Sequence, residues 1–281
     1  MDWGRIATVG AALLVLVLAL VAGRLVVRAI PWRPPRRAPL GPVPASWMAI
    51  LDAHVPAFAR LPDPDRHTLL QLMQEFLRDK HFEGAGGLVV TEEMQITIAA
   101  QACLLILHLD GPVYPDCRTI LVYPSTFMPR RVDPYRANMI VPQPITAELG
   151  ETATRSGVVV LAWDAVVGGA RDPDVGSNVT LHEFAHQLDM EDGGAEGVPI
   201  LEPPSSLRTW ATVLSRRFEE LRQDVDAGRE SVLSAYAATN KAEFFAVATE
   251  RFFERPADLL RDYPDLYEEL RKFYRQDPAR S

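Results

Sequence analysis

Two histidines and a glutamate with the spacing of a metal site stand beyond the middle of this chain. His182, Glu183 and His186 form an H-E-x-x-H pattern. Because residues four apart lie on one face of a helix, both imidazoles can reach a single cation. The carboxylate between them can reach a water on that cation. Zinc lowers the pKa of such a water to about 7, so the glutamate could act as general base in a hydrolysis.

Short patterns of this kind also arise by chance in helices that carry two histidines. The chain has only six histidines, however, and two of them fall in this pattern. The flanking residues are apolar and lack glycine and proline, which predicts a helix with Ser177 or Asn178 as its N-cap. We therefore expect one zinc ion per chain, held by the two histidines, with Glu183 as the base.

A catalytic zinc needs a third protein ligand. The segment 235–253 predicts a helix with carboxylates at Glu243 and Glu250, which are seven residues apart and share a face. Phe244 and Val247 line that face, which is an unusual environment for two solvated acids. One glutamate could be the ligand and the other its buried support. Both could equally belong to the solvated stripe of an amphipathic helix, and spacing alone leaves the choice open.

Two further features allow more than one interpretation. Asp189 follows His186 by three residues, so its carboxylate could accept a histidine N–H or form an ion pair at the helix end. The apolar segment 157–163 could be the edge strand that pairs with an extended substrate, or a simple buried strand.

The pattern of apolar residues predicts an α+β domain, because strands in the middle of the chain are preceded and followed by helices. The HExxH helix would lie beside a small mixed sheet, and the C-terminal part would be helical. Beside the HExxH helix, the predicted helices are 66–80, one capped by Thr91 and running through Leu109, 205–224, 241–254 and 264–275. The predicted strands are 119–124, 138–142 and 157–163.

The N-terminus predicts a membrane anchor. Residues 6–23 carry no charge over 18 residues, which is just enough to span a bilayer. A cleaved signal peptide is the alternative, but most of the positive charges follow the apolar run. We expect an uncleaved transmembrane helix in residues 1–30 of a bacterial-type inner-membrane protein, a Pro/Arg-rich linker in 31–45 and a cytoplasmic peptidase domain in 46–281.

Charge and cysteine content exclude other classes of protein. The formal net charge is −8, and residues 1–40 carry six Arg and one Asp, a balance of +5 that leaves −13 for the rest. A domain this acidic repels phosphate backbones, which argues against direct binding of nucleic acid. Cys103 and Cys117 are the only cysteines, too few for a disulfide framework.

Several stretches together make the sequence similar to a known family, the Mlc titration factor A family of zinc peptidases. The matching stretches are LVVTEEMQITIAAQACLLIL, ILVYPSTF, GVVVLAWD, SNVTLHEFAHQLDMEDG, GVPIL, AYAATNKAEFFAVATERFF and PDLYEELRKFYRQDP. They follow one another from about residue 66 to 278. The pair HEFAHQLD and YAATNKAEFFAV is the most specific part. The resemblance implies a zincin-like fold similar to the catalytic domain of anthrax lethal factor, a gluzincin.

The resemblance also implies roles for individual residues. His182 and His186 match the histidine ligands, Glu243 matches the third ligand, and Glu183 matches the catalytic base. Tyr236 matches a tyrosine thought to aid catalysis, and its phenol could donate a hydrogen bond to the oxyanion of a tetrahedral intermediate.

Two functions follow as hypotheses. The first is an aminopeptidase-like zinc peptidase that acts on a peptide or protein substrate, with Glu250 in a supporting role near the metal. The second is a binding protein that sequesters a transcriptional repressor or another regulatory partner, with catalysis minor.

Overall fold

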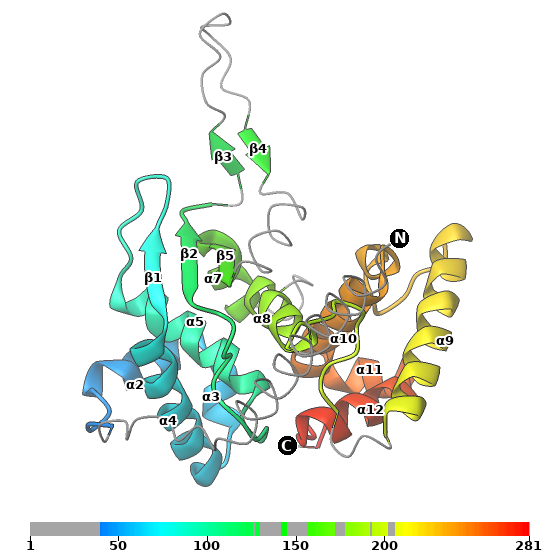
Figure 1. The fold of residues 1–281 in the computed structure, drawn as a ribbon, viewed down its shortest axis with the longest axis horizontal. Coiled ribbons are helices and arrows are strands. Elements are labelled where there is room, and N and C mark those ends of the chain that lie inside the picture. The colour runs from blue at the N-terminus through cyan, green and yellow to red at the C-terminus, as the bar shows by residue number, and fades with distance from the viewer. Residues whose placement is uncertain are drawn as a thin grey trace, which may run out of the picture. The chain divides into compact units, whose positions relative to one another are not determined.

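Among the residues that the structure describes, three short parallel strands form a sheet (Figure 1). In the computed structural model, residues 40–125, 127–129, 142–144, 157–171, 178–191, 193–201 and 206–280 are described. The strands are β1 (His81–Gly84), β2 (Thr119–Tyr123) and β5 (Val158–Ala162), in the order β1-β2-β5. In their register Thr119 pairs with both His81 and Val158. Alternate residues of β2 are buried, whereas four of the five residues of β5 are buried, so β5 is covered on both faces.

A separate pair of strands is antiparallel: β3 (Phe127–Pro129) and β4 (Pro142–Pro144). The prediction of one small mixed sheet is therefore corrected to a parallel sheet and a separate antiparallel pair. The predicted strand 138–142 lies outside the described residues except for Pro142. The coarser prediction, a domain of many helices around a small sheet, is confirmed.

The helix at the centre of the domain is α5 (Glu92–Leu105). Every residue from Ile96 to Leu105 is buried, since the run is almost entirely apolar. Thr91 caps this helix as predicted, with its hydroxyl accepting the Met94 N–H at 3.3 Å. Around α5 pack α2, α4 and the later helix α8. The helices that precede it are α2 (Ala45–His54), α3 (Pro56–Arg60) and α4 (Asp63–Asp79).

The chain after the sheet is helical (Figure 1). Its elements are α7 (Trp163–Arg171), α8 (Val179–Asp189), α9 (Leu207–Asp226), the 3₁₀ helix η3 (Ala235–Ala238), α10 (Lys241–Glu254), α11 (Pro256–Asp262) and α12 (Pro264–Tyr274). In Figure 1, α8 lies between the elements that carry the sheet and the helices α9 to α12. It contacts α5 and β5 on one side and α10 on the other. This position brings α8, which carries the HExxH residues, against the helix that carries Glu243.

One hydrophobic core joins these two sides of the domain. Phe184 of α8 packs against Phe76 and Tyr114, with ring centroids 5.6 and 4.7 Å away. On the other side, α10 is buried from Phe244 to Phe253. Aromatic side chains of α10 pack against aromatic rings of α9 and α12. The two helices that carry the predicted metal ligands, α8 and α10, are thus held in one packed core.

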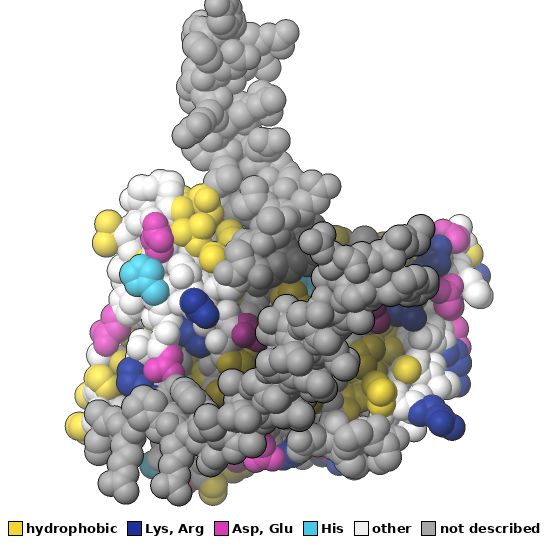
Figure 2. All heavy atoms as spheres, in the orientation of Figure 1, with side chains coloured by type: hydrophobic (Ala, Val, Ile, Leu, Met, Phe, Trp, Pro, Cys, Tyr) yellow, Lys and Arg dark blue, Asp and Glu magenta, His cyan; other side chains and the backbone are white. Residues whose placement is uncertain are grey.

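The outward face of α9 shows how the surface differs from this core. Buried residues recur along the helix at Trp210, Leu214, Phe218 and Leu221, a helical period that turns the remaining positions to solvent. Figure 2 shows acidic and basic side chains side by side over this helix. Several form ion pairs, such as Arg217 with Glu220 at 2.8 Å.

The predicted localisation is wrong. No helix within the described ranges is long and apolar enough to cross a membrane, which overturns the assignment as a single-pass inner-membrane protein. The predicted anchor in residues 1–30 and most of the predicted linker lie outside those ranges. The predicted start of the peptidase domain at Ser46 stays a prediction, and Pro42–Ser281 form one compact unit.

Candidate metal centre

The helix α8 presents the residues of the HExxH pattern on its less buried side. Asn178 caps the helix, with its side-chain oxygen accepting the Leu181 N–H at 3.1 Å. Leu181, Phe184, Ala185 and Leu188 are buried in the core. Because these residues fix the rotation of the helix, His182, Glu183 and His186 face the space between α8 and α10.

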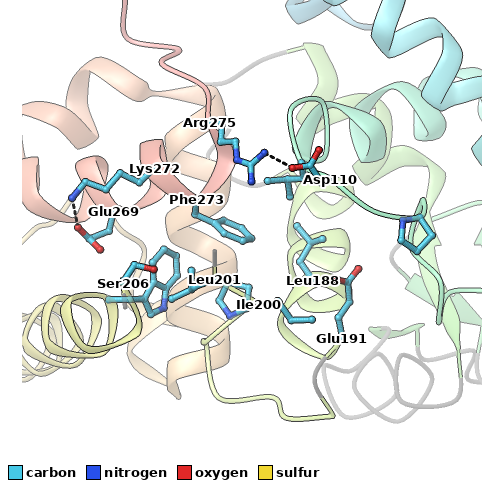
Figure 3. A pocket seen from close by; sticks show the side chains of 14 residues that line it. Asp110, Leu188, Glu191, Ile200, Leu201, Ser206, Glu269, Lys272, Phe273 and Arg275 are labelled. Carbon is cyan, nitrogen blue, oxygen red and sulfur yellow. Dashed lines mark hydrogen bonds and ion pairs between the residues drawn. The ribbon is translucent and has the colours of Figure 1, made fainter. Parts of the chain in front are cut away.

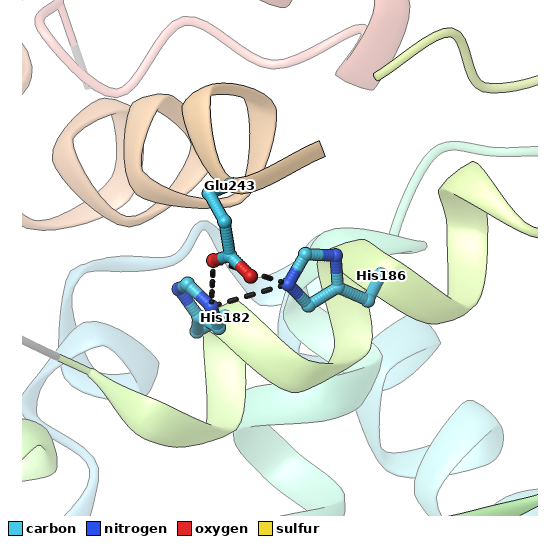
Figure 4. Close-up of side chains that lie close together, drawn as sticks. All are labelled: His182, His186 and Glu243. Atoms are coloured by element: carbon cyan, nitrogen blue, oxygen red, sulfur yellow. Dashed lines mark hydrogen bonds and ion pairs between the residues drawn. The ribbon is translucent and has the colours of Figure 1, made fainter. Parts of the chain in front are cut away.

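The first turn of α10 brings Glu243 to the same place. Asn240 is the N-cap, and its side-chain oxygen accepts the Glu243 N–H at 2.9 Å. From Phe244 onward the helix is buried, so Glu243 stands where α10 emerges from the core. Figure 4 shows its carboxylate pointing toward the two imidazoles of α8.

Three donor atoms converge between the helices (Figure 4). Oε2 of Glu243 lies 2.9 Å from Nε2 of His182 and 3.5 Å from Nε2 of His186. The two Nε2 atoms are 3.2 Å apart. Within the described part of the chain, this is the only group of His, Cys, Asp or Glu side chains with metal-ligand spacing.

These distances fit one small cation. Zinc bonds to nitrogen and oxygen at about 2.0–2.2 Å, so donor atoms at tetrahedral angles lie about 3.3 Å from one another. The three measured separations, 2.9, 3.2 and 3.5 Å, bracket that value. Two imidazoles and one carboxylate are also the donor set of many catalytic zinc sites, which leave the fourth position open.

Glu250 supports the site from behind His182. Its Oε1 lies 2.7 Å from Nδ1 of His182, and its Oε2 accepts the N–H of Asn178, the residue that caps α8, at 2.8 Å. An ionised carboxylate can only accept, so the Nδ1 of His182 carries the proton and Nε2 of the neutral ring keeps its lone pair for a cation. Spacing could not distinguish the two glutamates, whereas in the structure Glu243 belongs to the donor cluster and Glu250 lies against Nδ1 of His182.

The groups around the cluster shift the pKa values of His182 and Glu243 in opposite directions. Burial would lower the pKa of His182, but the adjacent Glu243 and Glu250 raise that pKa to about 10. Burial would raise the pKa of Glu243, but the two imidazoles lower it well below its ordinary value. Glu243 is thus held ionised. Because protons would compete with a cation for His182, binding of a metal there would be coupled to proton release.

Glu183 lies beside the cluster in a pocket of about 120 Å³. Burial raises the pKa of its carboxyl, and His182 and His186 oppose that rise. A carboxylate whose pKa is raised in this way is a better proton acceptor near neutral pH. Tyr236 of η3 lines the same pocket, with its ring centroid 6.0 Å from that of His182 and 43% of its surface exposed.

Asp189 forms two hydrogen bonds with the backbone of the loop that follows α8. It is 1% exposed, and its two carboxylate oxygens accept the N–H groups of Gly197 at 2.9 Å and Val198 at 2.6 Å. Asp189 thus anchors the loop that follows α8, while Glu250 lies on the Nδ1 side of His182.

Sequence reasoning missed several residues of this pocket. Asn240 has a signal in the sequence, because an Asn followed three residues later by Glu is typical of a helix N-terminus. Lys241, Met190 and Ala195 also line the pocket, and they carry no comparable signal. Lys241 begins α10, whereas Met190 and Ala195 lie just after α8.

A larger cavity of about 390 Å³ lies at the far end of α8 (Figure 3). Arg275 pairs with Asp110 at 2.7 Å, and Lys272 pairs with Glu269 at 2.8 Å. The other residues that line this cavity are mostly apolar. Despite its size, this cavity holds no converging donor atoms within the described ranges, so the candidate metal site lies in the smaller pocket.

Known proteins match nearly the whole chain. Residues 30–275 match the family model of the glucose-regulated metallo-peptidase M90. An uncharacterized protein of Synechocystis sp. is 39% identical over 240 residues, which are 84% of this chain and 86% of that protein. The Mlc titration factor A of Serratia proteamaculans is 31% identical over 252 residues, 88% and 92% of the two chains. That of Yersinia pestis is 30% identical over 257 residues, 89% and 91%.

Proposed function

Since the chain belongs to the glucose-regulated metallo-peptidase M90 family, as its resemblance to Mlc titration factor A predicted, we propose that it is a zinc-dependent peptidase. The observation that carries the proposal is the convergence of His182, His186 and Glu243 at separations that suit one zinc ion. Zinc bound there would supply a water of lowered pKa and polarise the substrate carbonyl.

Three residues beside the proposed ligands lie where each could take one role in the hydrolysis. Glu183 takes a proton from the attacking water and passes it to the leaving amine, since it shares the pocket with the three ligands. Tyr236 donates a hydrogen bond to the oxygen of the former carbonyl as negative charge develops on it. Glu250 keeps His182 in the tautomer that a ligand needs and fixes the orientation of its ring.

We further propose that the substrates are small peptides cleaved at a free N-terminus. The small volume of the pocket supports this, because about 120 Å³ accommodates little more than one residue beside the metal. Cleavage of alanyl-p-nitroanilide should exceed that of its N-acetylated form at equal concentration. Faster cleavage of the acetylated compound would indicate endopeptidase action.

A second candidate function is the binding of a regulatory protein, which the name of the titration-factor relatives supports. The two functions can occur in one molecule. Replacing Glu183 by Gln separates them, because it removes the base and leaves the surface of the protein almost unchanged.

The experiment that tests the proposal compares the native chain with Glu183→Gln. We expect one zinc per chain in both proteins and a loss of peptide cleavage of at least about 10²-fold in the variant, which is the usual contribution of a general base. Full cleavage by Glu183→Gln would exclude Glu183 as the base. Absence of zinc from the native protein would exclude the proposed mechanism.

A further inference from the structure

Gly197 lies where the loop after α8 meets both α9 and α10. Its N–H donates to Oδ2 of Asp189 at 2.9 Å, and its carbonyl accepts the indole N–H of Trp210 at 3.0 Å. Asp189 and Trp210 are each 1% exposed, so both hydrogen bonds are shielded from water. Val198 donates to the other oxygen of Asp189 at 2.6 Å. The loop is therefore fixed to the end of α8 and to α9.

The same glycine touches the peptide that begins α10. A Cβ at Gly197 would stand 3.0 Å from the carbonyl carbon of Lys241 and closer still to its oxygen. The φ angle of Gly197 is +73°, which side chains other than glycine rarely adopt. Both its conformation and its surroundings thus require glycine, because the loop packs directly on the backbone of Lys241.

These contacts form a short path between the two ligand-bearing helices. Asp189 follows His186 by three residues, and Lys241 precedes Glu243 by two. The path from one ligand to the other runs through Asp189, Gly197 and Lys241. Since the donor atoms already lie 2.9–3.5 Å apart, a displacement of about 0.5 Å between α8 and α10 would spoil the geometry for one cation.

We propose that Gly197 and Asp189 are positioning residues that set the separation of α8 and α10 and thereby the geometry of the metal ligands. The inference rests on the proposed function in one respect, the ligand set His182, His186 and Glu243. A loop that only connects two helices would need neither a buried carboxylate with two backbone donors nor a glycine pressed against the ligand helix.

The loop also contains a matched control. Gly193 has a φ of +89°, and a Cβ there would have no atom within 4 Å. Replacing Gly193 by Ala therefore costs conformational energy alone, whereas Gly197→Ala adds the clash with Lys241. The difference between the two variants isolates the contact between loop and helix.

The test uses the full chain and zinc itself as the probe. Zinc affinity is measured by competition with a chelator, and the visible spectrum of the cobalt(II)-substituted protein reports the ligand geometry. We expect Gly197→Ala to bind zinc 10–100-fold more weakly than Gly193→Ala and to show an altered cobalt spectrum, with native circular dichroism. Equal zinc affinity in the two variants would overturn the inference.

If Gly197→Ala does not fold, the zinc affinity of Asp189→Asn tests the inference instead. This change keeps the size of the side chain but replaces one acceptor oxygen by an NH₂ group, which faces the N–H of Gly197 or Val198. We expect a several-fold weaker affinity for zinc, and an unchanged affinity would overturn the inference. A native chain that binds no zinc would overturn the proposed function itself, an outcome distinct from an unchanged variant.

Discussion

Two cavities lined by residues of α8 each hold an acidic side chain, and the pKa values of these two acids are shifted in opposite directions. In the smaller one, two imidazoles lower the pKa of Glu243, so its carboxylate stays ionised. In the larger one, burial and the charge of Asp116 raise the pKa of Glu191 to about 7. The other acids of the larger cavity, Asp110 and Glu269, are paired with cations. The volume of a cavity therefore does not identify the candidate metal site. The site is identified by side-chain atoms that converge and could share one cation.

The largest effect is expected from removing a ligand of the smaller cavity. Glu243→Gln replaces an anionic ligand by a neutral amide, so we expect the protein to lose zinc on dialysis and to lose peptidase activity with it. Glu269→Gln is the matched control in the larger cavity and should retain one zinc per chain. Equal zinc content in the two variants, measured by elemental analysis, would remove the distinction between the cavities.

The next largest effect is expected at Tyr236. Tyr236→Phe removes a hydrogen-bond donor and keeps the ring, so kcat should fall by about 10²–10³-fold while zinc content is unchanged. Steady-state kinetics on a chromogenic aminoacyl substrate measure this. A change in KM with native kcat would mean that the phenol acts in substrate binding instead.

A smaller effect on the metal is expected at Glu250. Glu250→Gln weakens the hydrogen bond that fixes the His182 tautomer, and zinc affinity should fall 10–100-fold. Chelator competition measures it. Native affinity in this variant would show that His182 is oriented by packing alone.

The smallest effect is expected on the free energy of unfolding and comes from Glu191 in the larger cavity. Because the pKa of Glu191 is higher in the folded protein than in the unfolded chain, the folded state binds more protons, and stability falls as pH rises from about 5 through 7. Glu191→Gln should remove this part of the pH dependence. The gain at pH 8 should be about 1 kcal/mol, since Glu191 is partly exposed and its charge is screened. Denaturant unfolding at pH 5 and 8 tests the sign, and a variant less stable than the native chain at pH 8 would contradict it.

Helices with strong local signals were predictable from the sequence. The predicted range 241–254 coincides with α10, because Asn240 provides a cap and Pro256 follows its end. The strand β1 was missed since it has only four residues, two of them exposed, and no apolar alternation. The short helix α11 was missed because Pro256 and Pro264 bound a segment of only seven residues.

The residues of the site could not be fully predicted from the sequence for a different reason. Spacing places Glu243 and Glu250 on one face of a helix, but the choice between them depends on how α10 lies against α8, which no local pattern encodes. Asp189 shows the same limit. Its spacing from His186 does not indicate that the path of the loop through Gly197 brings its carboxylate to two backbone N–H groups.

A single zinc ion is predicted to bind between α8 and α10. Crystals of the full chain grown with zinc and measured on both sides of the zinc absorption edge test it most directly. We expect one anomalous peak within bonding distance, about 2.0–2.2 Å, of Nε2 of His182, Nε2 of His186 and a carboxylate oxygen of Glu243. A zinc-loaded crystal with no peak at these three residues would contradict it.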